Sequence, residues 1–137
     1  MIRRLLLPVA IRSVGLLAIG TGLLVLPGCY GGGTSPEPPS SPANVQAATE
    51  NGSVTLTWDG GTDVSGYNVY RGTSSFSGAN RTPVNGDAPL EQSMFTDNAV
   101  ETGTRYYYRV TAVGEGGESE PSAEVSVRPF PSPPPRP

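Results

Sequence analysis

The sequence predicts an all-β fold, an antiparallel sandwich of seven short strands that occupies residues 42–129. The clearest observation is that Gly103–Val113 carries an apolar side chain at every second position: Tyr106, Tyr108, Val110 and Ala112. Period-two alternation places these side chains on one face of a strand, opposite a polar face. A second observation is that shorter alternating segments recur, separated by Gly-, Ser- and Asn-rich turns, with no helical period between them.

In chain order, the other predicted strands are Ala43–Ala48, Ser53–Trp58, Gly66–Arg71, Arg81–Val84, Ser93–Asp97 and Ala123–Arg128. Asn51-Gly52 favours a tight turn that joins the first two of these strands. The fourth is at most a short edge strand, because Pro83 cannot donate a hydrogen bond to a sheet ladder. Phe76, in the loop before it, is expected to fold back on the core.

The same alternation assigns directions to the side chains of these strands. The expected inward-facing set is Val45, Val54, Leu56, Trp58, Tyr67, Val69, Phe95, Val125 and Val127. Asn68 and Tyr70 are expected to face outward. Trp58 and Tyr106 are expected to contribute most to the core, because a buried aromatic side chain removes about 150–250 Å² from water.

Residues 1–28 have the pattern of a secretory signal peptide. Arg3, Arg4 and Arg12 precede the uncharged run Ser13–Pro27, which the sequence predicts to be a helical signal segment. A stable membrane-spanning helix needs about twenty apolar residues, and this run has fifteen. Cleavage is therefore expected, with an uncleaved membrane anchor as the alternative.

The run ends in Leu26-Pro27-Gly28-Cys29, which resembles the lipobox of bacterial lipoproteins. The resemblance implies that the thiol of Cys29 carries a diacylglyceryl group after cleavage before Cys29. It also implies anchoring in the bacterial cell envelope, at the outer membrane or the cell surface, because two or three acyl chains hold stably where one does not. Pro27 departs from the usual Ala, Ser or Thr of the lipobox, so a free Cys29 remains the alternative.

Proline-rich stretches flank the predicted domain. Residues 29–41 are expected to be a tether that is flexible at its glycines and polyproline-like after them. Residues 130–137 are expected to be a disordered, solvated tail, although proline-rich segments also dock into aromatic grooves.

Charge and composition narrow the classes of function. Of the nine Arg, three precede Cys29, which leaves six against 12 acidic residues after it. This acidic balance disfavours nucleic acid as a partner, since nucleic-acid binding requires clustered basic residues. The chain has no His, the commonest general base and metal ligand. We therefore expect no enzyme activity, no cofactor and no metal, and a monomeric chain.

Several motifs together resemble a fibronectin type III domain of the bacterial extracellular type: VTLTW (Val54–Trp58), GYNVYR (Gly66–Arg71), FTDNAVETGTRYYYRVTAV (Phe95–Val113) and GESEPS (Gly117–Ser122). The resemblance covers about residues 41–128. It implies an immunoglobulin-like sandwich with Trp58 in the core. It also implies a corner in which the hydroxyl of Tyr106 pins the chain near Val100. Bacterial domains of this type are found beside extracellular polysaccharide-degrading enzymes.

Acidic residues gather in two predicted loops, Asp59 and Asp63 in one and Glu115, Glu118 and Glu120 in the other. Paired carboxylates can hydrolyse glycosides or hold Ca²⁺. The spacing fits no calcium loop, and a sandwich of this size rarely provides a catalytic cleft. These carboxylates are expected to be solvated loop charges.

The candidate binding face is Tyr70, Tyr107 and Arg109, which are expected to share the outer side of one sheet. Exposed aromatic and Arg side chains are enriched in binding hot spots, although cross-strand pairs of this kind also stabilise sheets. The chain is predicted to be a lipid-anchored module of the cell envelope that acts as a binding domain or as a spacer. The alternatives are a carbohydrate-associated accessory module and a structural envelope lipoprotein with a protein partner.

Overall fold

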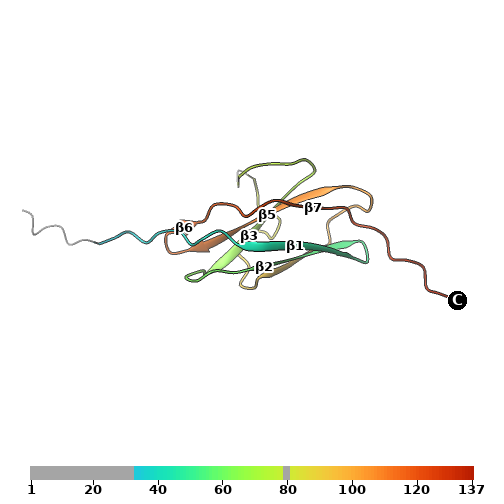
Figure 1. Cartoon of the computed structure of the whole chain (residues 1–137), viewed down its shortest axis with the longest axis horizontal. Coiled ribbons are helices and arrows are strands. Elements are labelled where there is room, and N and C mark those ends of the chain that lie inside the picture. The colour runs from blue at the N-terminus through green and yellow to red at the C-terminus, as the bar shows by residue number, and fades with distance from the viewer. Residues whose placement is uncertain (1–32, 79–80) are drawn as a thin grey trace, which may run out of the picture. The chain divides into compact units, whose positions relative to one another are not determined.

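The computed structural model describes residues 33–78 and 81–137, and the compact unit Ser35–Pro137 is a sandwich of two antiparallel sheets (Figure 1). The strands are β1 (Ala43–Glu50), β2 (Ser53–Asp59), β3 (Gly66–Gly72), β4 (Met94–Asp97), β5 (Tyr106–Gly114), β6 (Gly117–Glu118) and β7 (Val125–Val127). One sheet has the order β1-β2-β4. In the other, β5 pairs with β3 along one edge and with β6 and β7 along the other. The predicted all-β sandwich is confirmed.

The predicted signal segment and Cys29 lie outside the described residues. Within the described part of the chain, no helix has the length and apolar character needed to cross a membrane. The compact unit begins at Ser35, so the last residues of the predicted tether belong to it.

The core lies between the two sheets and is built from the alternating residues of β2, β3 and β5. Its buried hydrophobic members are Val54, Leu56, Trp58, Tyr67, Val69, Tyr106, Tyr108, Val110 and Ala112. The rings of Trp58 and Tyr67 meet edge to face, with centroids 5.4 Å apart. All of these residues were expected to face inward from the two-residue period alone.

The segment before β5 makes the expected tyrosine corner. The hydroxyl of Tyr106 accepts a hydrogen bond of 3.0 Å from the backbone N–H of Glu101. Gly103, between the two, has φ +87°, a left-handed conformation that glycine adopts without steric cost. The corner therefore fixes how the chain enters its longest strand.

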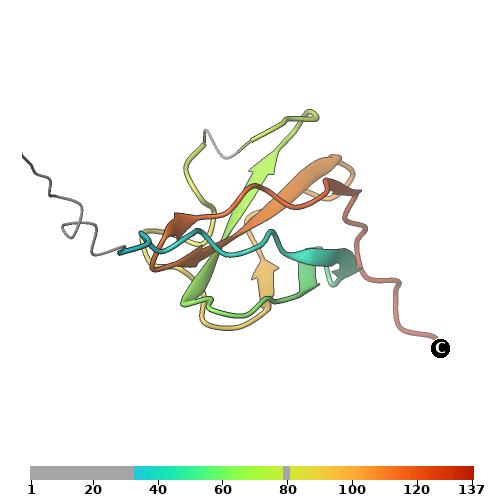
Figure 2. The same ribbon diagram turned by 60° about the vertical axis from the view of Figure 1, so that its left-hand side comes forward.

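The connection from β3 to β4 differs from the prediction, because Arg81–Val84 is not a strand (Figure 2). Residues 84–90 instead run irregularly along the free edge of β3. The N–H of Val84 donates to the carbonyl of Val69 (2.8 Å), and Leu90 exchanges two backbone bonds with Tyr67 (2.8 and 2.9 Å). The free edge of β3 is thereby satisfied without a regular strand, and Pro83 lies just before the first of these bonds.

Two buried serines complete the other edge of β5, in the segment around Pro121 that lies between the pairing of β5 with β6 and its pairing with β7. The hydroxyl of Ser119 accepts from the N–H of Ala112 (2.9 Å), and that of Ser122 accepts from the N–H of Val110 (3.0 Å). The N–H groups of the same two serines donate to the carbonyls of Ala112 and Val110. Side-chain oxygens thus replace backbone carbonyls along this edge, so β5 is bonded along most of both sides.

A buried ionic network ties the two sheets together near the start of β5. Asp97 of β4 is only 3% exposed, and its Oδ2 accepts from Arg71 of β3 (2.7 Å) and from the hydroxyl of Tyr108 (3.0 Å). Its Oδ1 accepts from the N–H of Ala99 (3.0 Å). Burial and the charge of Asp97 raise the pKa of Tyr108, because both disfavour the phenolate.

Candidate functional site

The register of β3 and β5 places the three predicted binding residues on one side of their sheet. Tyr70 lies directly opposite Arg109, and Tyr107 lies opposite Gly72, one step further along the same face. Asn68 and Thr111 form the next pair on that face. Tyr70, Tyr107 and Arg109 therefore share one outer face as expected, but this face is less exposed than expected.

Tyr70 is 3% exposed, so the expectation that it faces solvent is wrong. Its hydroxyl donates to Oε1 of Glu118 at 2.6 Å. The same oxygen accepts from the side-chain amide of Asn68 at 3.2 Å and from the hydroxyl of Thr111. Glu118 reaches these donors because it pairs with Val113 in the short β5–β6 hairpin. We call Glu118 and its three donors the outer network.

The outer network shifts two ionisation equilibria in opposite directions. Burial, and then the hydrogen bond and charge of Glu118, raise the pKa of Tyr70 to about 12. Burial alone would raise the pKa of Glu118, but hydrogen bonds from Thr111, Tyr70 and Asn68 lower it overall. Glu118 is thus an ionised acceptor that links β3 and β5 to the β5–β6 hairpin, so it has a structural role that was not expected of a loop carboxylate.

Arg109 is held by neighbouring segments of the chain. Its Nε donates to the carbonyl of Phe76 (2.6 Å), and a terminal nitrogen donates to the carbonyl of Ser122 (2.7 Å). Nε also lies 3.6 Å from Oε2 of Glu124, which accepts from the N–H of Phe76 (2.9 Å). Arg109 and Glu124 therefore hold the loop after β3 against the sheet.

Glu124 is tuned to remain ionised in this arrangement. Burial opposes its ionisation, but the Phe76 N–H, the Ser75 hydroxyl and the charge of Arg109 together lower its pKa. The hydroxyl of Ser75 donates to Oε1 of Glu124 at 2.7 Å. One carboxylate thus binds two consecutive residues of the loop.

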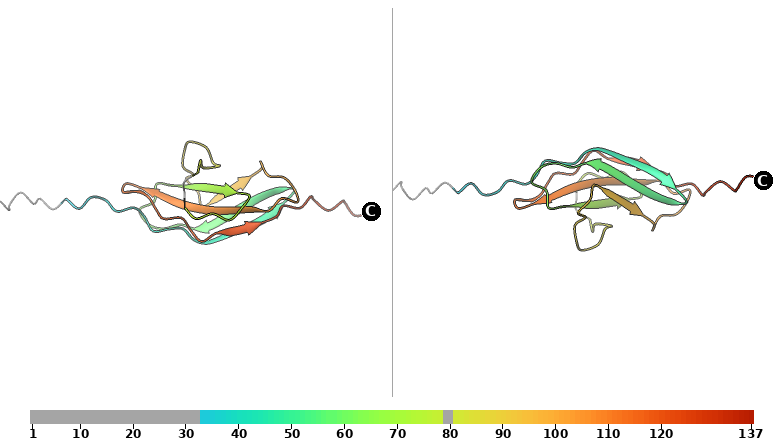
Figure 3. Two further views of the ribbon diagram at one scale, coloured as in Figure 1. Left: turned by 90° about the horizontal axis from the view of Figure 1, so that it is seen from above. Right: turned by 90° about the horizontal axis from the view of Figure 1, so that it is seen from below.

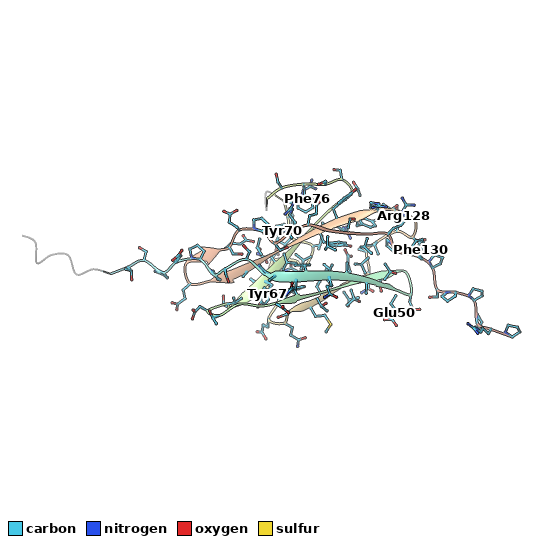
Figure 4. The ribbon with its side chains drawn as sticks, in the orientation of Figure 1. Glu50, Tyr67, Tyr70, Phe76, Arg128 and Phe130 are labelled. Carbon is cyan, nitrogen blue, oxygen red and sulfur yellow. The ribbon has the colours of Figure 1, made fainter. Side chains whose placement is uncertain are left out.

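Phe76 lies on the outer side of the sheet, so the expectation that it folds onto the core is wrong. The guanidinium of Arg81 lies 4.5 Å from its ring centroid, and that of Arg109 lies 5.9 Å away. Both distances are in the range of cation–π attraction. In Figure 4, Phe76 lies on the same side of β3 as Tyr70, and Tyr67 lies on the other side.

Tyr107 is the aromatic member of the predicted face that keeps partial exposure. It lies between Gly72 of β3 and Ser126 of β7, two small neighbours beside which its ring stays partly exposed. The surface that remains for a ligand is therefore Tyr107 with the rim of Phe76 and Arg81, smaller than the predicted face.

The acidic loops are close to the entry of the domain. Asp63 and Glu115 line a shallow hollow of about 600 Å³ together with Glu37. Asp59 accepts from the side-chain amide of Asn44 at 2.7 Å. Among residues 33–78 and 81–137, no three His, Cys, Asp or Glu side chains gather in an arrangement that could hold a metal ion.

The family model for the fibronectin type III domain matches residues 38–128 of this chain. The chain belongs to the fibronectin type III family. A solved structure of an Fn3-like protein from Clostridium thermocellum is 33% identical, with a TM-score of 0.58, and the match covers 69% of this chain and 95% of that one. The predicted family is thereby confirmed over the two-sheet unit.

Curated relatives of this fibronectin type III chain include two large enzymes. An amylopullulanase of Thermoanaerobacterium saccharolyticum is 36% identical over 92 residues, 66% of this chain and 7% of the enzyme. A poly(3-hydroxybutyrate) depolymerase of Ralstonia pickettii is 40% identical over 81 residues, 58% of this chain and 14% of the enzyme. The chain therefore spans a small fraction of the length of these relatives.

The outer network predicts an alkaline effect on stability. Tyr70→Phe removes one hydrogen bond to a carboxylate and should lower the free energy of unfolding at pH 7 by about 1 kcal/mol. Because the pKa of Tyr70 is raised to about 12 from 10.0 in the fold, its contribution is complete below pH 10 and is lost as the pH rises to 12. Urea titrations should therefore show that the difference in free energy of unfolding between wild type and Tyr70→Phe becomes smaller between pH 10 and pH 12.

Tyr107→Phe is the matched control, since it removes the same atom from the same face. It should change stability little, with no such narrowing. A constant gap between wild type and Tyr70→Phe from pH 7 to 12 would contradict the assigned role of the Tyr70 hydroxyl.

Proposed function

We propose that this chain is a non-catalytic accessory module of a system that degrades carbohydrates or other polymers, in which it acts as a spacer of fixed length. The observation that carries the proposal is that the chain enters and leaves the domain at opposite ends of β5. Nine residues of extended strand separate these ends by roughly 27 Å, at about 3.4 Å per residue. Figure 3 shows the entering segment and the tail at the two ends of the domain.

The entering segment is held closely at one end. A Cβ added to Gly116 would lie 2.2 Å from the carbonyl carbon of Glu37, and one added to Gly114 would lie 2.7 Å from Cγ of Pro39. Only glycines leave room for the proline-rich segment to pack on this turn. The last part of the tether is therefore a fixed part of the spacer.

The leaving segment is held at the other end. Pro129 is almost completely buried, and its carbonyl accepts from the N–H of Gly103 at 2.9 Å. The two attachment points lie beside the two ends of β5, so this strand fixes the distance between the entering and the leaving segment.

The relatives support the accessory role, since an amylopullulanase and a poly(3-hydroxybutyrate) depolymerase share this domain over a small part of their length. The outer face of the β3–β5 sheet supports the spacer role as well, because other segments of the chain cover most of that face and leave little of it for a ligand. A second candidate is direct contact with a glycan through Tyr107, which is favoured by the partial exposure of its ring.

Spin labels at Ser35→Cys and Arg128→Cys, in a Cys29→Ser background, test the spacer. We expect one narrow distance distribution centred beyond roughly 27 Å, because both ends are attached to β5. Gly116→Val should broaden it, since a side chain there collides with the backbone of Glu37.

A broad distribution in the unmodified domain would contradict the spacer. If the chain instead sediments with insoluble starch, and Tyr107→Ala but not Tyr107→Phe abolishes this, the glycan-contact candidate replaces it.

We further propose that Cys29 carries the lipid that anchors this spacer in the bacterial cell envelope. The support is the sequence Leu26-Pro27-Gly28-Cys29 after an uncharged run, followed by a tether that leads to the docked segment. The alternative is that the chain is a structural lipoprotein of the envelope that binds a protein partner there. A lipid at Cys29 would keep the module near the membrane, within the reach of the tether.

The intact mass of membrane-extracted protein tests the anchor. We expect the loss of residues 1–28 and the addition of acyl mass in the wild type, and neither change in Cys29→Ala. An uncleaved leader with an unmodified Cys29 would show that Pro27 prevents processing, and the anchor would then be rejected.

A further inference from the structure

The segment from Arg128 to Pro137 has a backbone restricted at every position. Each residue in it is either a proline or directly precedes a proline. Proline fixes its own φ near −65°, and the residue before it is excluded from the helical region. Both restrictions favour polyproline II, a left-handed helix with three residues per turn and about 3.1 Å rise. The segment is therefore expected to be a stiff rod.

Three residues per turn divide the rod into three ridges. One ridge carries Pro131, Pro134 and Pro137, and the next carries Phe130, Pro133 and Arg136. The third carries Pro129, Ser132 and Pro135.

The third ridge is the one that faces the domain. Pro129 is buried, and the hydroxyl of Ser132 donates to the side-chain oxygen of Asn51 at 2.6 Å, in the turn between β1 and β2. Phe130, on the second ridge, is 62% exposed. Residues 131–137 are also exposed, and Figure 4 shows the tail leaving the domain beyond Phe130. The contacts of the third ridge thus leave the proline ridge and the Phe130 ridge open to solvent.

We propose that residues 130–137 are a preformed polyproline II ligand for a partner protein with an aromatic-lined groove flanked by a carboxylate. The rings of Pro131 and Pro134 present flat apolar surfaces one turn apart, which fit between aromatic side chains. Arg136 follows at the spacing Pro-x-x-Pro-x-Arg and supplies a cation for the acidic flank. Because the prolines already restrict the backbone toward polyproline II, little conformational entropy is lost on binding.

The charges of the segment favour a protein groove over a phosphate-rich surface. Arg128 and Arg136 are its charged residues, whereas nucleic acids and anionic membranes select clusters of cations. A single Arg at a fixed distance from two prolines would instead set the direction and register in which the segment lies in a groove.

A purified SH3 domain that recognises Pro-x-x-Pro-x-Arg is a suitable probe, titrated with the full chain in detergent micelles by calorimetry. We expect saturable binding by the wild type. Pro134→Ala and Arg136→Ala should each weaken it at least about tenfold, as expected for a central contact of an interface.

Pro135→Ala is the matched control, because it removes the same ring from the ridge that faces the domain. It should retain the wild-type affinity, and all three variants should melt at the wild-type temperature, since residues 134–136 lie outside the core. Absence of binding by the wild type would overturn the proposal. An equal loss in Pro134→Ala and Pro135→Ala would overturn it too, because the ridges would then not differ.

Discussion

The buried carboxylate of Asp97 is the constraint on which the packing of the two sheets depends. It is provided by the short edge strand β4, and it is satisfied by Arg71 of β3 and Tyr108 of β5 from the opposite sheet. A buried charge without partners is strongly unfavourable. The observed packing of the two sheets satisfies this charge, and Val54 and Leu56 of β2 belong to the same buried core as Val110 of β5.

A second layer of polar contacts closes the outer side of the β3–β5 sheet. Glu118 binds three side chains of that face, and Glu124 with Arg109 fastens the loop of Phe76. A sheet covered on both sides presents little free surface for a ligand. On this sheet, Tyr107 with the rim of Phe76 and Arg81 remains available for contacts. At the two ends of the domain, the tether enters and the proline-rich segment leaves, which is the arrangement expected of a spacer.

Local alternation was sufficient to predict the core and its largest members. The inward direction of Trp58, Tyr106 and Tyr108 follows from the two-residue period, and the family resemblance gave the corner at Tyr106. The burial of Tyr70 could not be predicted in this way, because its partner Glu118 lies 48 residues away and depends on the register of a two-residue strand. The irregular edge at residues 84–90 was missed for a similar reason, since its bonds to β3 are long-range and follow no period.

The stability of Asp97→Asn in urea tests the central role of this carboxylate most directly. The substitution keeps the shape and removes the charge, so Arg71 loses its charged partner, and we expect the free energy of unfolding to fall by about 3 kcal/mol. Asp59→Asn, the same change at an exposed site on β2, should alter stability by no more than about 0.5 kcal/mol. If Asp97→Asn is no more destabilised than Asp59→Asn, the two sheets do not depend on this network.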